Sequence, residues 1–369
     1  MTKRWGVVLP LFVFGVIMTM WSFKTPICTD EYEFYKLSSN LPSYSSTADW
    51  FLKDRPSMLN FSVPWSIDQQ AKAFHQVYDA QVYPHTPLMP IAMYPLVKSL
   101  NSLADKGVIP SIESQPGYPT DKSQPMSAET ITKVLRFVPI ILFLISMYLI
   151  YKITKYKVGN SAYFFAVALA ACYQLLMGAY LFYWDVFMMF FFVLTLYLQQ
   201  RNSKWAYVTA CLMVNTKMFI PMLFLIPLMV KNPKMVFAGF SILPFYFITW
   251  AVTGEPFYVF THYLNQLGIH DYVYQVYNFK DWALILTGLG MPLFALMTLP
   301  LFKYVKKYPE YIALLVVTCL YAFSSGLALT HMSSLLYAAA LIFPIVAYEY
   351  KLYEKFNKLF PSTKEANAQ

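Results

Sequence analysis

Charged residues are scarce in this sequence. Only 13% of its 369 residues are Asp, Glu, Lys or Arg, whereas 58% are hydrophobic and 19% are aromatic. Soluble domains carry about 25% charged residues, so the composition argues against an ordinary cytosolic enzyme. It is typical of a chain with much of its surface in lipid and at lipid–water boundaries. The same composition excludes an intrinsically disordered chain.

Cysteines are few, and the common cofactor and nucleophile motifs are absent from the sequence. The four cysteines lie far apart, which excludes a disulfide scaffold and gives no zinc or redox spacing. There is no phosphate-binding glycine loop, GxGxxG, HExxH or serine nucleophile elbow, and no haem or iron–sulfur spacing. An enzyme of this composition would therefore use a substrate that arrives through the lipid already activated.

Long apolar stretches predict an all-α polytopic membrane protein with about ten transmembrane helices and both termini in the cytoplasm. The first stretch, Gly6–Ser22, follows two cations and has no clear cleavage site after it, so we interpret it as a retained span. The other nine spans are expected at residues 134–151, 161–182, 185–199, 205–217, 218–230, 235–252, 282–302, 311–328 and 332–349.

The stretch 205–230 decides the orientation of everything that follows it. As one span it would place Lys303, Lys306 and Lys307 outside, whereas a hairpin with its tip near Lys217 keeps them in the cytoplasm. Each arm of roughly 13 residues reaches only about 20 Å, so Lys217 is expected below the outer surface. The hairpin also collects most cations inside, so the net charge of +9 implies no nucleic-acid partner.

A long polar stretch, residues 23–133, is predicted to form the first extracytoplasmic loop. Within it, residues 86–104 could be a further span, but they contain three prolines and Lys98. Such a span would also place the lysine-rich segment 152–157, interpreted as a cytoplasmic loop, on the outside. We therefore predict an amphipathic helix on the outer membrane surface at 86–104.

Three charged motifs on the predicted outer side could carry chemistry. The adjacent carboxylates Asp30 and Glu31 could supply a general base or bind a cation, or they could simply start a helix. Asp185, at the outer junction of two spans, is either a functional charge with a partner or an interfacial cap. Lys217, at the hairpin tip, is placed to meet a phosphate, or else it snorkels to lipid.

Single residues on the same side are further candidates. His85, within a proline-rich segment, could contact a phosphate or a sugar, although a lone histidine is more often structural. Arg136 at the head of the second span and His331 between the last two spans have the same two interpretations. Tyr32, Tyr83 and His331 are candidates for substrate contact.

The order and placement of these motifs resemble the GT-C superfamily of integral-membrane glycosyltransferases. These enzymes use polyprenyl-phosphate-linked sugars and include protein O-mannosyltransferases and aminoarabinose transferases. The resemblance covers roughly residues 6–230. It rests on a first span followed by an acidic pair in a long outer loop, Asp30-Glu31, and by a segment similar to the family's His-Pro-Pro-Leu type, Tyr83-Pro84-His85-Thr86-Pro87-Leu88. An arginine at the head of the second span, Arg136, a second acid, Asp185, and a lysine–proline hairpin, Lys217 to Pro221, follow in that order.

The resemblance implies a catalytic transmembrane module at residues 1–230, followed at 231–369 by further transmembrane helices and a cytoplasmic tail. It implies transfer of a sugar, mannose-like as a first guess, from a polyprenyl-phosphate donor to a hydroxyl of a lipid, glycan or protein acceptor. The reaction would take place on the extracytoplasmic or lumenal face of a plasma membrane or endoplasmic reticulum membrane.

The resemblance also implies roles for individual residues. Asp30 would be the base of an inverting single displacement, and Glu31 and Asp185 would position the acceptor or the base. Lys217, with Arg136 and His85, would hold the donor phosphate. No cofactor or metal is required by this scheme, although the three carboxylates together could hold a divalent cation.

Two other classes of protein stay open at this stage. A secondary transporter or a flippase of lipid-linked glycans would explain the spans and the buried charges, and it should show inverted repeats and broken helices. A non-catalytic membrane scaffold would explain the aromatic residues but not the acids at Asp30 and Asp185.

Overall fold

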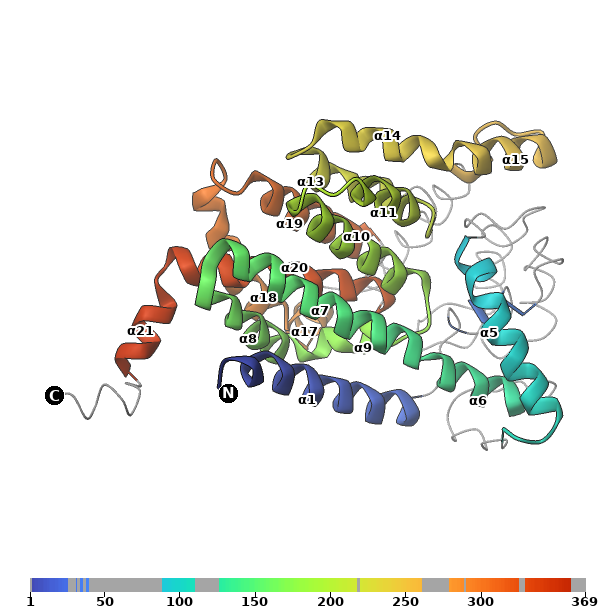
Figure 1. The fold of residues 1–369 in the computed structure, drawn as a ribbon, viewed down its shortest axis with the longest axis horizontal. Helices are drawn as coiled ribbons and strands as arrows, with labels where there is room; N and C mark the ends of the chain where they lie inside the picture. The colour runs from blue at the N-terminus through green and yellow to red at the C-terminus, as the bar shows by residue number, and fades with distance from the viewer. Residues whose placement is uncertain are drawn as a thin grey trace.

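Helices pack side by side in the computed structural model of the chain (Figure 1). The structure describes residues 2–25, 31, 34–35, 38–39, 88–109, 126–217, 220–260, 279–288, 290–324 and 329–359. Every regular element within these ranges is a helix, so the all-α prediction is confirmed for this part of the chain.

The predicted spans differ in how regular their helices are. The first half of the chain forms α1 (Thr2–Lys24), α5 (Leu88–Asp105), α6 (Met126–Leu135), α7 (Phe137–Val158), η3 (Gly159–Tyr163), α8 (Phe164–Ala171), η4 (Tyr173–Leu175), α9 (Leu176–Ala179) and α10 (Trp184–Gln200). The second half forms α11 (Trp205–Val214), α12 (Ile220–Leu223), α13 (Leu225–Met229), η5 (Pro233–Met235), α14 (Val236–Gly239), η6 (Phe240–Ile242), α15 (Leu243–Thr253), α17 (Phe279–Gly288), α18 (Met291–Thr298), η7 (Leu299–Tyr304), α19 (Pro309–Ser324), α20 (Leu329–Glu349) and α21 (Leu352–Leu359). The predicted spans 185–199 and 332–349 match α10 and α20, whereas 161–182 and 282–302 are broken into short helices.

Within the described residues, four helical stretches are long and apolar enough to cross a membrane, which is consistent with a membrane protein. They are Val7–Lys24, Thr130–Ala171, Pro233–Ala251 and Met332–Glu349, and five shorter apolar helices accompany them. Large apolar side chains of α1, such as Phe12 at 66% exposure, lie on the surface of the bundle, as lipid-facing residues would. The number of ten spans and the side that each loop faces stay predictions.

The segment 152–157, predicted as a loop, is helical in the structure, and the side of the membrane that it faces stays a prediction. α7 continues through these residues to Val158, so its lysines lie in the last turns of a helix. Cations are favoured there because they face the partial negative charge of the helix C-terminus. Gly159, with a positive φ of 56°, then ends the helix.

The central helix of the bundle is α20. Its apolar stretch is 83% buried, and it packs against α7, α8, α9, α10, α18 and α19. Three consecutive alanines, at 338–340, are fully buried, and such small side chains let neighbouring helices approach closely.

The chain reverses at the predicted hairpin. α11 leads away from Tyr207, and α12 and α13 return to the same level, where the Asn232 amide donates a hydrogen bond of 3.0 Å to the Tyr207 hydroxyl. The Gln199 amide likewise donates to the Leu228 carbonyl at 3.0 Å. The contact between Asn232 and Tyr207 brings the two ends of this segment together, which is consistent with the predicted hairpin and its tip near Lys217.

Charged residues gather at the two opposite ends of the bundle. The basic end, as we name it, comprises residues 153–160, 199–207, 228–235 and 303–310. The motif end comprises residues 22–25, 31, 136, 180–185 and 215–217. The helix α10 joins the two ends, because it begins next to Asp185 and ends at Gln200.

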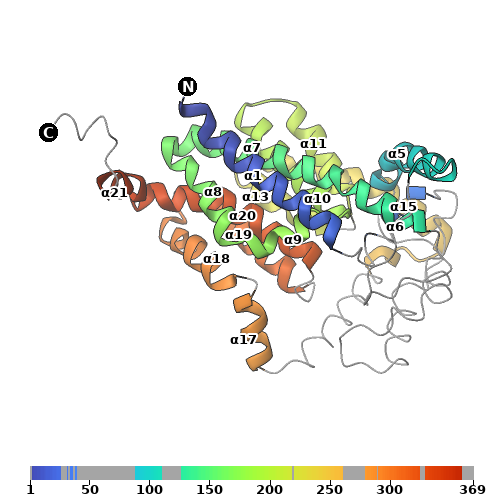
Figure 2. The same cartoon turned by 90° about the horizontal axis from the view of Figure 1, so that it is seen from below.

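Two helices of the predicted outer loop lie at the motif end. α6 continues the line of α7 beyond the bundle, and α5 runs across its end (Figures 1 and 2). A small hydrophobic cluster that includes Phe34, Val97, Leu135 and Trp184 holds them to the start of α10. The helix predicted at 86–104 is present as α5. Its position on a membrane surface stays a prediction.

Candidate functional site

The motif end contains a buried ion pair between Glu31 and Arg136. The Arg136 Nε atom lies 2.7 Å from Glu31 Oε1, and Nη2 lies 2.5 Å from Oε2. Neither side chain is exposed to solvent. Such a bidentate pair is both strong and specific in geometry.

Arg136 occupies the junction of α6 and α7 and also closes the end of α1. Its Nη1 atom donates to the Ser22 carbonyl and, at 2.8 Å, to the Thr25 carbonyl. The last carbonyls of a helix have no partner within the helix, so Arg136 supplies donors that the end of α1 needs. The guanidinium is therefore committed to Glu31 and to α1.

A second buried cluster joins Asp185, Lys217 and Tyr321. The Lys217 ammonium lies 3.1 Å from Asp185 Oδ2 and donates to the Tyr321 hydroxyl at 2.8 Å. The Tyr321 hydroxyl in turn donates to Asp185 Oδ1. All three residues are at most 3% exposed, so a carboxylate, an ammonium and a phenol form a closed triangle away from solvent.

Local structure explains how three distant parts of the chain supply this triangle. Asp185 lies in the first turn of α10, where the helix dipole favours an acid. Lys217 follows the end of α11, where the Asn215 amide donates to Ser241 Oγ at 2.8 Å and fixes the turn. Tyr321 comes from the last turn of α19.

One segment, residues 180–185, contacts both ion pairs. The Phe182 backbone N–H donates to Glu31 Oε1 at 2.9 Å, and the Arg136 guanidinium lies 5.6 Å from the centre of the Tyr180 ring. Further along, the Lys217 ammonium lies 4.9 Å from the centre of the Tyr183 ring, and Asp185 ends the segment. A change at one pair is therefore expected to reach the other through this segment.

Two acidic side chains, Glu31 and Asp185, and two cationic side chains, Arg136 and Lys217, are buried at the motif end, and each charge is paired with an opposite one. Burial of a charge is costly unless it is paired and hydrogen-bonded, and these pairs meet that condition. Lys217 is the cation that we consider for an exchange of partners, because its ammonium contacts the Asp185 carboxylate at 3.1 Å and a neutral phenol. An incoming anion could compete with Asp185 for it.

The remaining predicted site residues are not brought into this geometry. Asp30, Tyr32, Tyr83 and His85 lie outside the described residues, and so does the side chain of His331, although its backbone lies in the first turn of α20. Among the residues that the structure describes, no group of three or more His, Cys, Asp or Glu could hold a metal ion. The predicted roles of these five residues stay predictions.

Sequence reasoning missed the role of Tyr321 and the contacts that residues 180–183 make with both ion pairs. Tyr321 is one of 30 tyrosines, and it lies in a stretch that hydropathy identifies only as a span. A buried tyrosine hydroxyl usually has a hydrogen-bond partner, but the sequence does not show which of these tyrosines is buried. Comparisons of the chain with protein-family models, curated proteins and solved structures find no match.

Proposed function

We propose that this protein is a membrane glycosyltransferase that moves a sugar from a polyprenyl-phosphate donor to an acceptor hydroxyl. The observation that carries the proposal is the buried triangle of Asp185, Lys217 and Tyr321 beside the Glu31–Arg136 pair. The reaction requires a base and a cation that stabilises the leaving phosphate, and Lys217 at this end of the bundle would supply the cation next to the acids Glu31 and Asp185.

Lys217 is proposed to bind the donor phosphate. The donor phosphate, a diester with one negative charge, would compete with the Asp185 carboxylate for the ammonium, and the ammonium would stabilise the second negative charge that develops as polyprenyl phosphate leaves. Asp185 would then be released toward the acceptor hydroxyl, which it would position. Tyr321 would keep both side chains in place through its hydroxyl.

Arg136 is proposed to position the site, in place of the phosphate contact expected from the sequence. Its guanidinium donates to both oxygens of Glu31 and to two carbonyls of the chain. Glu31 would in turn fix the residue next to it in the sequence, Asp30, as the proposed base. His85 keeps its proposed contact with the phosphate or sugar.

The chemical step is a single displacement. Asp30 takes the proton from the acceptor hydroxyl, whose oxygen forms a bond to the anomeric carbon of the sugar. The bond between that carbon and the phosphate oxygen breaks, and polyprenyl phosphate leaves with its electron pair. The anomeric centre inverts, and the leaving phosphate needs no proton donor because its charge is stabilised by Lys217.

The proposal includes ten spans and places the motif end on the extracytoplasmic or lumenal side. A cysteine-free background carrying either Lys106→Cys or Lys306→Cys tests this, because both lysines are exposed and lie on opposite predicted sides. A membrane-impermeant maleimide should label residue 106 in intact cells, and residue 306 only after lysis. The reverse pattern would place the motif end on the cytosolic side and would contradict the proposal.

Activity is tested with the purified protein and a polyprenyl-phosphate hexose. Release of polyprenyl phosphate should depend on an acceptor lipid or peptide, and Asp30→Asn should abolish it while the protein stays folded. Asp105→Asn is the matched control, because Asp105 is exposed at the end of α5. Equal turnover by Asp30→Asn and the wild type would remove the proposed base.

A second candidate function, transport or flipping of a lipid-linked glycan, is favoured by the broken helices. The chain leaves regular α-helix between α8 and α9, and again before α18, where Gly290 has a positive φ of 74°. Discontinuous helices of this kind form substrate sites in many transporters. Movement of a labelled lipid-linked sugar across sealed vesicles, without transfer of the sugar, would support this function over the first.

A further inference from the structure

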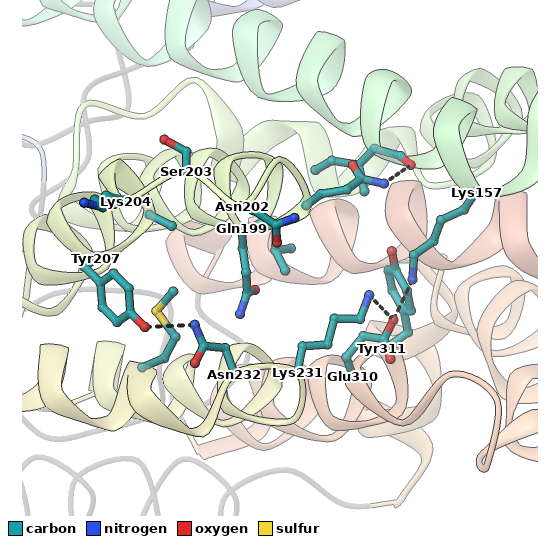
Figure 3. Close-up of a pocket in the computed structure, with 15 residues that line it drawn as sticks. Lys157, Gln199, Asn202, Ser203, Lys204, Tyr207, Lys231, Asn232, Glu310 and Tyr311 are labelled. Carbon is teal, nitrogen blue, oxygen red and sulfur yellow. Dashed lines mark hydrogen bonds and ion pairs between the residues drawn. The ribbon is translucent and has the colours of Figure 1, made fainter.

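A pocket of about 550 Å³, lined by lysines, amides and apolar side chains, lies at the basic end, on the opposite side of the bundle from the candidate site. Helix α10, with 17 residues, separates the two places by roughly 24 Å at 1.5 Å per residue. Small-molecule pockets commonly have volumes of about 300–1,000 Å³. Figure 3 shows Lys157, Lys231, Gln199 and Asn232 around this space.

Two lysines share a single carboxylate oxygen in the pocket. The ammonium groups of Lys157 and Lys231 lie 2.6 and 2.9 Å from the same atom, Oε1 of Glu310 (Figure 3). Two positive charges therefore face one negative charge, and Lys204 adds a third cation to the lining. The pocket has a positive formal charge without any ligand.

The two lysines differ in how tightly they are held. Lys157 is 19% exposed and packs over the ring of Tyr311 at 4.4 Å, whereas Lys231 is 44% exposed. Lys231 is thus the cation that can turn toward a ligand while Lys157 keeps Glu310 compensated. Breaking a partly exposed contact costs less than breaking a buried one.

Neutral hydrogen-bonding groups complete the pocket. The side chains of Gln199, Asn202 and Asn232 line it together with the Tyr207 hydroxyl. Amide and hydroxyl donors next to a lysine are a suitable environment for a tetrahedral anion, which accepts several hydrogen bonds at once. A cation would be repelled by the excess of lysine.

We propose that this pocket binds a phosphate group of a ligand that enters from the basic end. The phosphate takes the Lys231 ammonium from Glu310 and accepts hydrogen bonds from the second N–H of the Gln199 and Asn232 amides, whose first N–H bonds the Leu228 carbonyl and the Tyr207 hydroxyl. Its source is either an anionic phospholipid headgroup or a soluble phosphate compound, and both present the same chemistry to the pocket. The site is separate from the proposed glycosyltransferase site and does not depend on that activity.

Two probes distinguish the sources of the phosphate in binding experiments on the full-length protein. Inorganic phosphate is titrated into detergent-solubilised protein at constant ionic strength, with chloride as the reference. Phosphatidylglycerol retention is measured by native mass spectrometry after exchange from nanodiscs that contain phosphatidylcholine and phosphatidylglycerol. Saturable binding of inorganic phosphate supports a soluble ligand, and selective retention of phosphatidylglycerol alone supports a lipid headgroup.

Three variants test whether the pocket is responsible. Lys231→Gln should weaken binding of the active probe at least about tenfold, whereas Lys306→Gln, an exposed lysine at the same end, should leave binding unchanged. Glu310→Gln should strengthen binding, because it removes the competing carboxylate. Equal weakening by Lys231→Gln and Lys306→Gln, weaker binding by a folded Glu310→Gln protein, or no binding of either probe would overturn the proposal.

Discussion

Glu31 and Arg136 are 105 positions apart in the sequence, and their side chains form a bidentate ion pair with no solvent exposure. The pair joins residue 31 to the junction of α6 and α7, and the same guanidinium binds the end of α1. Three separate parts of the chain thus depend on one buried side chain. We expect this dependence to be visible in the stability of the protein.

Arg136→Gln should destabilise the folded protein by about 3–5 kcal/mol, because it leaves the buried Glu31 carboxylate without its partner. Unfolding in detergent measures the change. Lys307→Gln is the control, since Lys307 forms an exposed pair with Glu349 at 2.6 Å. The hydrogen bond to Glu349 raises the pKa of Lys307, which keeps the ammonium protonated. Lys307→Gln therefore removes one positive charge, as Arg136→Gln does. Equal loss of stability in both variants would show that burial of the Arg136–Glu31 pair adds nothing to the free energy of unfolding.

The Asp185–Lys217 pair should show strong coupling in a double-mutant cycle. Asp185→Asn removes the carboxylate that the buried Lys217 ammonium contacts, Lys217→Gln removes the ammonium that the buried Asp185 contacts, and the double variant removes both charges. The double variant should therefore be more stable than the sum of the single changes predicts, by about 1–3 kcal/mol. Transfer activity should be lost in all three variants. Activity in the double variant would exclude both side chains from the chemistry.

Tyr321→Phe should slow sugar transfer and destabilise the protein by about 1–3 kcal/mol, because Lys217 and Asp185 both lose a hydrogen-bond partner. Tyr337→Phe is a matched control from α20. The Tyr337 hydroxyl is buried and has no hydrogen-bond partner in the part of the chain that the structure describes, so its removal should be neutral. Paired measurements of unfolding and initial rate separate the two effects.

Gly290→Ala should destabilise the break before α18. Gly290 has a φ of 74°, and a Cβ atom there would lie 3.1 Å from Gln174 Oε1. Side chains other than glycine are disfavoured at this φ. Gly288→Ala, two residues earlier, meets no atom within 4 Å and lies in a helix, where alanine is favoured over glycine. A lower unfolding temperature for Gly288→Ala than for Gly290→Ala would contradict this account of the break.

The sequence by itself determined the helical class of the described residues and the bounds of its most regular helices. Apolar runs in the sequence located α10 and α20, because hydropathy is a local property and each of these segments is apolar over its whole length. The charge pattern also predicted a hairpin at 205–230, and the hydrogen bond between Asn232 and Tyr207 is consistent with that prediction. The breaks near Cys172 and Gly290 escaped prediction because both segments, 161–182 and 282–302, have no charged residue to interrupt an apolar run.

Only the tertiary structure decided which charged groups are partners. The sequence indicated that Asp185 needs a counterion, but Lys217 and Tyr321 become its neighbours only when α10, α11 and α19 pack together. Arg136 looked like a phosphate ligand because its charge was visible in the sequence, whereas the carbonyls and carboxylate that occupy it were not. Hydropathy and periodicity act over one or two turns of helix, while the pairing of buried charges depends on how helices from distant parts of the chain meet.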